Sequence, residues 1–435
     1  MLKNKIETIA QVAREGLCTG CGTCAGVCPR EAIEMQVIQG VYLPEIDWRK
    51  CTRCGLCFKC CPGLSMNFEL LNKKVFGMQP DDKLLGNYVR CYVGHSTDHE
   101  IRYNSSSGGV VTQLLIFALE ENLIDGALVT CMKKSDPLKP KPFIARTRRD
   151  IISASKSKYC PVAANEALKN IRKEKGRFAV VGLPCHIHGI RKAEENVKAL
   201  KEKIVLHLGL MCSHTVSFFG TELLLKKLGV AQEQVAEINY RGKGWPGSML
   251  IKLKNHSSVS IPYISGWNAY WPVFSCFFFT PKRCLICPDQ TNELADISVG
   301  DAWLPELKNE RIGKSIIVAR TIKGEEILKF ACSSKVLSLK SIECEKVKRS
   351  QREPLRFKKN DIGIRAAMIG YSGEKIPPFS RLQNSSYSFS SWARNFWALI
   401  NVRASEYKVF KQFLTYIPFP VIKLYYGVYK FLSFI

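Results

Sequence analysis

Long apolar runs and acidic residues are both scarce in this sequence of 435 residues. No window of eighteen residues is apolar and free of charge, and Pro418 and Pro420 interrupt the apolar C-terminal stretch, so we expect no membrane-spanning helix. The N-terminal segment lacks the apolar core of a secretory signal, which predicts a protein of the reducing cytoplasm. Only 38 Asp and Glu oppose 64 Lys and Arg, giving a net charge of +26. Such a charge attracts nucleic acid, anionic lipid or an acidic protein.

Patterns typical of nucleic-acid-binding domains are absent as well. The sequence contains no helix-turn-helix, RRM or zinc-finger pattern, so we expect no nucleic-acid partner. Hydrophobic residues make up 46% and charged residues 23%, as in ordinary folded proteins. A chain of this length predicts more than one domain.

Cysteine is abundant by contrast, and eight of the nineteen cysteines form two runs with the same C-x2-C-x2-C-x3-C-P spacing. These are Cys18, Cys21, Cys24 and Cys28, then Cys51, Cys54, Cys57 and Cys61. Three close thiolates, completed by the fourth Cys of the other run, are the ligands of a cubane cluster, whereas zinc ribbons use pairs of C-x2-C. The spacing therefore predicts two [4Fe–4S] clusters. The segment of about residues 10–66 resembles a bacterial-type two-cluster ferredoxin, and we assign residues 1–66 to this domain.

Beyond residue 66 the sequence predicts a larger mixed domain. Residues 67–87 have mixed polarity with Gly and Pro and are interpreted as a linker. From Tyr88 onward, helical patterns alternate with short apolar strands, for example at Phe178–Val181 and Ile204–Leu210. The predicted class is α+β: the two-cluster unit, a mixed-sheet α/β domain, and a mostly helical C-terminal extension. We divide the larger part into residues 88–175, 176–345 and 346–435.

Four further cysteines stand in distinctive local contexts. Cys185 follows an apolar strand and a Gly-x-Pro turn, Cys212 ends a second strand, and Cys284 and Cys287 form a C-x2-C loop. Open α/β sheets place their sites at the carboxyl ends of strands, where these cysteines would converge. The spacing alone leaves a metal site and unrelated cysteines both open.

Several motifs of residues 88–340 occur in a characteristic order. They are SSSGGVVTQLL, SKY, GLPCHIHGIRK, LMC, CLIC and ELADISVGDAW. Together they resemble the beta-subunit family of coenzyme F420 hydrogenases and dehydrogenases, which also includes a plant hydroxymethyl-chlorophyll reductase. The resemblance implies a third [4Fe–4S] cluster on Cys185, Cys212, Cys284 and Cys287. It also implies bound FAD.

The segment Asn104–Gly109 is a candidate flavin loop, because it directly precedes an apolar helix expected at Val110–Glu121. Glycine permits close backbone approach and a helix N-terminus favours phosphate, although serine also suits an ordinary helix cap. Lys158 is expected to neutralise a phosphate or the reduced ring; a solvated surface lysine is the alternative. His186, His188 and His214 flank the cysteines, but we assign no catalytic residue. With the resemblance, the expected flavin contacts are Ser106, Ser107, Gly108, Gly109, Thr112, Lys158, Tyr159, Gly182 and Pro184.

A flavin beside three clusters would convert between hydride transfer and single electrons. We therefore expect a flavin-dependent iron–sulfur oxidoreductase that links a soluble one-electron carrier to coenzyme F420 or another small organic reactant. Relatives with an N-terminal ferredoxin unit occur alongside polysaccharide-assembly enzymes, which suggests a saccharide substrate. The alternative is a non-catalytic electron-transfer subunit that docks on a catalytic partner.

The C-terminal part is basic and aromatic. Residues 350–361 are charged and expected to be exposed, and residues 380–435 carry seven Lys and Arg against one acid, Glu406. Basic and aromatic residues together suit a peripheral contact with the anionic inner face of the membrane. A helical cap that packs its aromatic side chains on the core is the alternative.

Overall fold

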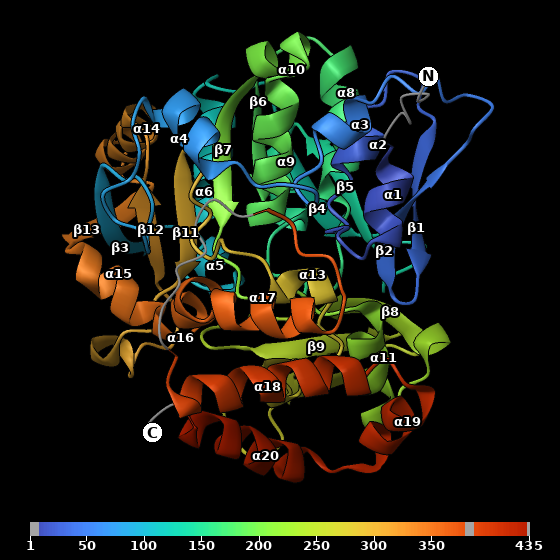
Figure 1. The fold of residues 1–435 in the computed structure, drawn as a ribbon. Helices are drawn as coiled ribbons and strands as arrows, with labels where there is room; N and C mark the ends of the chain where they lie inside the picture. The colour runs from blue at the N-terminus through green and yellow to red at the C-terminus, as the bar shows by residue number, and fades with distance from the viewer. Residues whose placement is uncertain (1–7, 379–386, 433–435) are drawn as a thin grey trace, which may run out of the picture.

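The computed structural model of the chain describes residues 8–378 and 387–432. A mixed eight-stranded sheet forms the centre, and the N-terminal unit lies along one side of it (Figure 1). A small three-stranded sheet and the C-terminal helices lie below the large sheet in this view. This arrangement agrees with the predicted α+β class.

The large sheet has the strand order β13-β3-β12-β11-β7-β6-β4-β5. Its four central strands pair in parallel: β11 (Ile297–Asp301), β7 (Ile204–Leu210), β6 (Phe178–Gly182) and β4 (Gly126–Met132). Antiparallel strands flank them: β5 (Pro140–Ala145) on one side, and β12 (Ser315–Ala319), β3 (Arg90–Ser96) and β13 (Leu337–Ile342) on the other. The carboxyl ends of the four central strands therefore meet at one edge.

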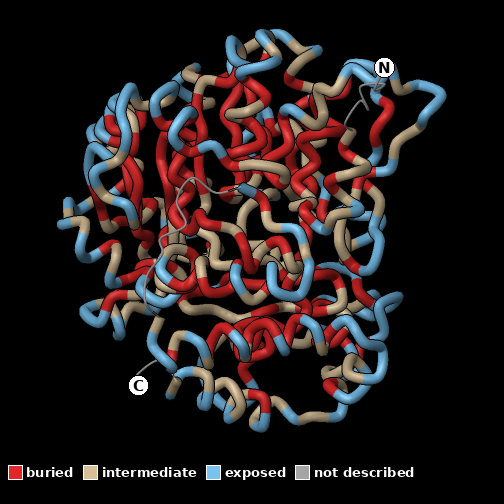
Figure 2. The backbone as a smooth tube through the Cα atoms, viewed as in Figure 1, coloured by how far each residue is buried: buried red, intermediate tan, exposed pale blue. Residues whose placement is uncertain are grey.

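Helices cover both faces of this sheet, which explains why its central strands read as apolar runs. Successive residues of β6 point to opposite faces: Ala179 contributes to one core cluster, and Phe178 and Val180 to the other. In Figure 2 these strands are largely buried. On the Ala179 face pack α5 (His99–Tyr103), α6 (Val110–Glu120), α7 (Arg148–Ser153) and α14 (Ile322–Ser333); on the other pack η1 (Ala164–Ala167), α8 (Leu168–Lys173), α9 (Pro184–Glu194) and α10 (Lys198–Lys203).

The N-terminal unit repeats one local design. It consists of α1 (Ile9–Arg14), α2 (Thr23–Val27), the antiparallel hairpin of β1 (Ile33–Ile38) and β2 (Val41–Ile46), and α3 (Leu56–Lys59). Both α2 and α3 begin directly after a glycine, Gly22 or Gly55, with φ of 80° and 74°. Glycine adopts this left-handed conformation without a steric penalty, so each cysteine run can turn sharply into its short helix.

Two segments differ from the prediction. The presumed linker contains α4 (Phe68–Phe76), whose Phe68 and Leu71 are buried against the large sheet's helices. Residues 350–361 form α16 (Arg352–Leu355) and the π-helical turn η4 (Arg356–Asn360), in which Leu355 and Phe357 are buried. In both segments charged residues are interspersed among the buried ones. The apolar face of each helix was therefore not apparent in the sequence.

The small sheet and the C-terminal helices share another core. The expected hairpin of β9 (Ser248–Leu253) and β10 (Ser258–Pro262) forms, and β8 (Val235–Asn239) extends it. No helix within residues 8–378 and 387–432 is long and apolar enough to cross a membrane. The other helices are α11 (Phe218–Lys227), η2 (Gln232–Gln234), α12 (Trp271–Ser275), α13 (Lys282–Leu285), η3 (Pro305–Leu307), α15 (Cys344–Ser350), α17 (Ile362–Tyr371), α18 (Phe389–Ala404), α19 (Lys408–Tyr416) and α20 (Phe419–Phe431).

Candidate functional site

A cavity of about 400 Å³ lies at the carboxyl edge of the central strands. Gly182 of β6, Leu210 of β7 and Asp301 of β11 border it from the sheet. Tyr263 and Trp271, next to the small sheet, border it as well. Ligand sites of α/β sheets form at such edges, and their volumes run from about 300 to 1,000 Å³.

Seven of the nine residues expected to contact a flavin border this cavity: Ser106, Ser107, Gly109, Thr112, Lys158, Tyr159 and Gly182. Gly108 and Pro184 do not. A Cβ at Gly108 would lie 2.6 Å from the carbonyl oxygen of Gly94, so glycine is needed there for packing against β3. Pro184 occupies the first turn of α9, where the missing N–H has no cost, and it starts the helix that carries Cys185.

The serine loop before α6 is held by its own hydroxyls. Ser106 Oγ accepts a hydrogen bond from the Ser157 amide at 2.8 Å, and Ser107 Oγ lies 2.8 Å from Ser315 Oγ at the start of β12. Gly109 has φ of 74° and precedes the first residue of α6. The loop and the helix N-terminus are therefore fixed in place beside the cavity.

Lys158 is half-buried, and its ammonium already donates hydrogen bonds to the backbone. Nζ donates to the carbonyl oxygens of Ala154 at 2.5 Å, Ser155 at 2.7 Å and Lys156 at 3.0 Å. Burial lowers the pKa of Lys158 to about 7. In this structure the lysine thus orders the 154–158 segment of the cavity wall, rather than presenting a free ammonium to a phosphate.

The four scattered cysteines converge next to the cavity. Burial raises the pKa of the Cys185 thiol, and the charges of Cys21, Cys287, Cys212 and Cys284 raise it further. The Cys212 amide donates to the carbonyl oxygen of Gln290 at 2.9 Å, three residues beyond Cys287. Cys212 also borders the cavity, and burial raises the pKa of its thiol to about 12. Buried thiols of this kind are unfavourable as bare thiolates, but iron would stabilise them as ligands. The donor set fits a cubane cluster.

Two buried cations accompany this group. Lys358 Nζ donates to the carbonyl oxygen of Cys284 at 3.0 Å, and Arg283 Nη1 donates to that of Ile286 at 2.8 Å. The charge of Lys358 lowers the pKa of Cys284 and Cys212, which burial raises overall. Positive charge here would offset part of the charge of four thiolates.

The eight N-terminal cysteines lie close enough to act on one another's pKa values. Burial raises the pKa of Cys24, and the charges of Cys18, Cys21, Cys61 and Cys57 raise it further. Burial also raises the pKa of Cys57, as do the charges of Cys28 and Cys54. The fourth cysteine of each run thus faces the other group. Within the described residues no group of three His, Cys, Asp or Glu is placed to hold a single metal ion.

The three groups form a series. Cys21 of the first N-terminal group acts on the pKa of Cys185, so this group adjoins the inner one. Cys54 of the other group is exposed, whereas Cys21 and Cys24 are buried. The series runs from the cavity through Cys212 and Cys21 to the surface at Cys54.

Close packing fixes the N-terminal unit against α9. A Cβ at Gly26 would lie 2.0 Å from the carbonyl oxygen of Asn165, and a Cβ at Gly189 would lie 2.1 Å from Thr23 Oγ1. Asn165 Nδ2 also donates to Thr23 Oγ1 at 2.8 Å and to the carbonyl oxygen of His186 at 2.9 Å. These contacts hold Cys21 and Cys185 at a fixed separation.

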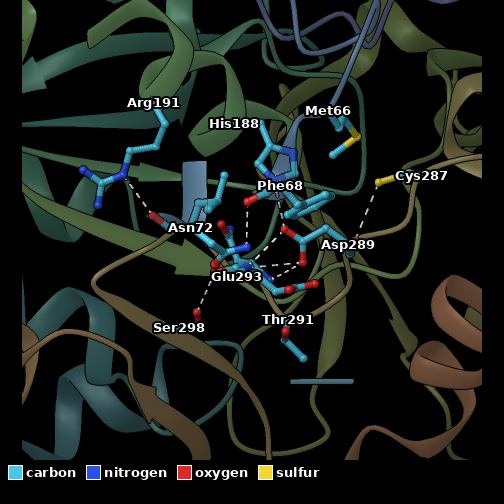
Figure 3. Close-up of polar contacts among 12 residues, drawn as sticks. Met66, Phe68, Asn72, His188, Arg191, Cys287, Asp289, Thr291, Glu293 and Ser298 are labelled. Atoms are coloured by element: carbon cyan, nitrogen blue, oxygen red, sulfur yellow. Dashed lines mark hydrogen bonds and ion pairs between the residues drawn. The ribbon is translucent and has the colours of Figure 1, made fainter. Parts of the chain in front are cut away.

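A buried polar loop at residues 289–293 positions the inner cysteines, and no pattern in the sequence predicted it. Figure 3 shows the Asp289 carboxylate among the residues that follow Cys287. It accepts hydrogen bonds from the backbone amides of Asn292 at 2.8 Å and Glu293 at 3.1 Å. Asn292 Nδ2 then donates to the carbonyl oxygens of Gly182 at 2.8 Å and Leu210 at 3.2 Å. Asn292 therefore joins the ends of β6 and β7, just before Cys185 and Cys212.

Three histidines lie near the inner cysteines in the sequence, and two of them border the cavity. His186 and His214 border the cavity, and His188 does not. Burial lowers the pKa of His186 and His214 to about 4, so both are neutral at pH 7. His186 Nδ1 accepts from the Leu183 amide and Nε2 lies 2.9 Å from the carbonyl oxygen of Val162, so this ring holds backbone.

Comparison with known proteins agrees with this arrangement. Residues 91–169 and 175–345 match the N-terminal and C-terminal models of the coenzyme F420 hydrogenase/dehydrogenase beta subunit, and residues 11–66 match a 4Fe-4S dicluster domain. The coenzyme F420 hydrogenase subunit beta of Methanothermobacter thermautotrophicus is 30% identical over 60% of this chain and 87% of its own length. The coenzyme F420-dependent sulfite reductase of Methanocaldococcus jannaschii is 28% identical over 81% of this chain, which spans about half (52%) of that protein.

A solved structure shares the fold. It is a chain of the F420-reducing [NiFe] hydrogenase complex of Methanosarcina barkeri, with 24% identity and a TM-score of 0.54, and the match covers 69% of this chain and 99% of that one. The chain therefore belongs to the coenzyme F420 hydrogenase/dehydrogenase beta subunit family of iron–sulfur oxidoreductases.

Proposed function

We propose that this protein passes electrons between a one-electron carrier and a two-electron organic reactant, through three [4Fe–4S] clusters and FAD. The observation that carries the proposal is the series of cysteine groups that ends at the wall of the cavity with Cys212. Clusters carry one electron at a time, whereas a flavin exchanges both single electrons and hydride. A flavin in the cavity would lie where the two kinds of chemistry meet.

The residues around the cavity suit FAD. The N-terminus of α6 and the fixed serine loop would receive the pyrophosphate, since backbone amides and the helix dipole favour negative charge there. Val181, Gly182 and Cys212 at the strand ends would lie against the ring. Bound FAD would supply the hydride chemistry. The protein holds the ring and excludes water with its largely apolar wall.

The outer end of the series suits an acidic carrier. Cys54 is exposed, and the exposed side chains around it in the chain include Arg49, Lys50, Arg53 and Lys59. Asp47 pairs with both Arg49 and Lys50, leaving an excess of positive charge. A basic rim around the outermost cluster would steer an acidic protein to it.

The organic reactant is proposed from the relatives' names and from the cavity. Coenzyme F420 appears in the names of the hydrogenase and sulfite reductase relatives, and a saccharide remains the second proposal. The aromatic side chains of Tyr263, Trp271 and Trp303 offer flat surfaces to either kind of ring. A non-catalytic subunit that docks on a catalytic partner is the alternative, because the solved structure belongs to a multi-subunit complex by its title.

Rapid mixing would test this function. Anaerobically purified protein loaded with FAD is mixed with a reduced acidic ferredoxin and then with coenzyme F420. We expect the flavin to bleach after the clusters and two carriers to be oxidised for each F420 reduced. Reduced clusters with no FAD bound would contradict the flavin proposal. Reduced clusters and flavin with no reaction of F420 or of nucleotide sugars would favour the docking subunit.

We also propose a peripheral membrane contact through α19 and α20. Val409, Phe413 and Tyr416 recur at helical spacing on α19 and are exposed. Helix α20 likewise exposes apolar side chains at helical spacing, namely Val421, Leu424, Val428 and Phe431. Exposed Lys408 and Lys430 lie at opposite ends of the pair. Apolar side chains flanked by basic ones suit an anionic membrane surface. The other faces of these helices pack on the core, for example through Leu414 and Ile422, as the helical-cap alternative predicts.

Serine substitutions test the membrane contact. Replacing Phe413, Leu424 and Phe431 together should reduce co-flotation with phosphatidylserine vesicles by about fivefold or more, because the lost apolar area supplies much of interfacial binding. The control replaces three exposed apolar residues elsewhere, Ile152, Ile322 and Val37, and should float like the parent protein. Equal flotation of both triple variants, or no flotation of the parent, would reject the contact.

A further inference from the structure

Arg241 presents an unsatisfied donor at the cavity. The residue follows β8, is 2% exposed, and borders the cavity. Its Nη1 donates to Asp301 Oδ2 at 2.6 Å and to the Tyr159 hydroxyl at 3.3 Å, and its Nε donates to the carbonyl oxygen of Pro246 at 3.1 Å. Its Nη2 is buried and has no hydrogen-bond partner. A buried guanidinium N–H without an acceptor is costly unless a ligand supplies one.

The surroundings of Arg241 define the shape of that ligand. The guanidinium lies over the ring of Tyr263, 4.3 Å from its centroid. Trp271 packs against Tyr263 with ring centroids 4.8 Å apart, and Trp303 is nearly parallel to Tyr263 at 6.5 Å. All three aromatic residues border the cavity. A flat ring system can therefore lie against this wall with an oxygen at its edge directed to Nη2.

The surroundings also define the charge of the ligand. Asp301 offsets the charge of Arg241, and the ion pair fixes the plane of the guanidinium. Lys156 also borders the cavity, but its ammonium bonds Asn239 Oδ1 at 3.2 Å. The Nη2 group of Arg241 remains as the donor. It suits a carbonyl oxygen of the ligand ring that gains negative charge when the ring is reduced.

We infer that Arg241 Nη2 binds the pyrimidine-dione oxygen of a tricyclic redox ring that lies against the Tyr263–Trp271–Trp303 wall. The inference deepens the proposed function by assigning a recognition residue. Flavin and deazaflavin rings share this edge, so the ring is either the FAD or the organic reactant. Arg241 stabilises the reduced ring more than the oxidised ring, because negative charge accumulates at that edge on reduction.

Substitution of Arg241 tests this role in the FAD-loaded protein. Arg241→Gln is expected to weaken binding of reduced FAD at least tenfold relative to oxidised FAD, which equals about 30 mV in the two-electron midpoint potential. The double variant Arg241→Gln/Asp301→Asn removes the ion pair without changing the net charge and should show the same shift. Arg241→Lys keeps the positive charge but lacks the forked N–H groups of the guanidinium. Its FAD potential should therefore lie between those of the parent protein and Arg241→Gln.

Each outcome decides the inference. Spectroelectrochemistry gives the potential, fluorescence gives the dissociation constants of FAD and coenzyme F420, and iron content shows that each variant folds. An unchanged FAD potential with tenfold weaker binding of F420 assigns the ring to the organic reactant. Unchanged values for both would overturn the inference. The control Lys254→Gln, at an exposed lysine that does not border the cavity, should change each dissociation constant less than threefold and leave the FAD potential unchanged. A parent protein that binds no FAD contradicts the proposed function but leaves the F420 measurement decisive for Arg241.

Discussion

Serine in place of Cys212 is expected to lower the iron content of anaerobically purified protein from about twelve to about eight atoms per chain. Cys212 joins the inner group and borders the cavity, so we propose it both as a cluster ligand and as the link to the reactant. A serine oxygen is a poor ligand for the cluster, and the three remaining thiolates cannot complete its four ligand positions. Transfer from a reduced carrier to the flavin should fall by at least a hundredfold. Iron and sulfide analysis with EPR of the reduced protein would measure the loss.

Cys60 supplies the matched control for this variant. It is fully buried and adjacent to Cys61, yet its spacing fits neither cysteine run. Cys60→Ala should therefore retain about twelve irons and all three cluster signals. An iron content unchanged in Cys212→Ser, or equally reduced in Cys60→Ala, would show that the inner cysteines do not hold a cluster.

The N-terminal cysteine motifs could be recognised in the sequence because their residues lie close together along the chain. Each run places three thiols within one short turn, and Gly22 and Gly55 repeat the same left-handed conformation. The strands at Phe178–Val181 and Ile204–Leu210 were predictable for the same local reason, because short apolar runs suit a sheet covered on both faces. The convergence of Cys185 and Cys212 follows from these parallel strands.

Long-range contacts account for what the sequence did not reveal. Arg241 reaches the cavity from the segment after β8 and stands in no recognisable pattern. Lys158 was expected to face a phosphate, but three carbonyl oxygens at the end of α7 hold its ammonium. The helix α4 was interpreted as a linker because only its Phe68 and Leu71 are apolar and buried. Such roles depend on which elements pack together, which composition and periodicity do not encode.

The largest stability effect outside the cysteines is expected at Asn292. Asn292→Ala removes two buried hydrogen bonds and leaves the carbonyl oxygens of Gly182 and Leu210 without this donor. The residue also has φ of 62°, which asparagine tolerates better than alanine. Together these losses should lower the free energy of unfolding by about 3 kcal/mol. Anaerobic urea unfolding, followed by the cluster absorbance and by circular dichroism, would measure the change.

The ends of β6 and β7 should loosen before the rest of the fold in this variant, so the inner cluster should be lost first under mild chelation. Asn292→Asp tests the cause, because a carboxylate fits the same space but cannot donate to the two carbonyl oxygens. The control Asn196→Ala removes one exposed bond to the carbonyl oxygen of Lys192 and should cost less than about 1 kcal/mol. If Asn292→Asp kept the inner cluster as firmly as the parent protein, the joining of these two strand ends would not be what positions Cys185 and Cys212.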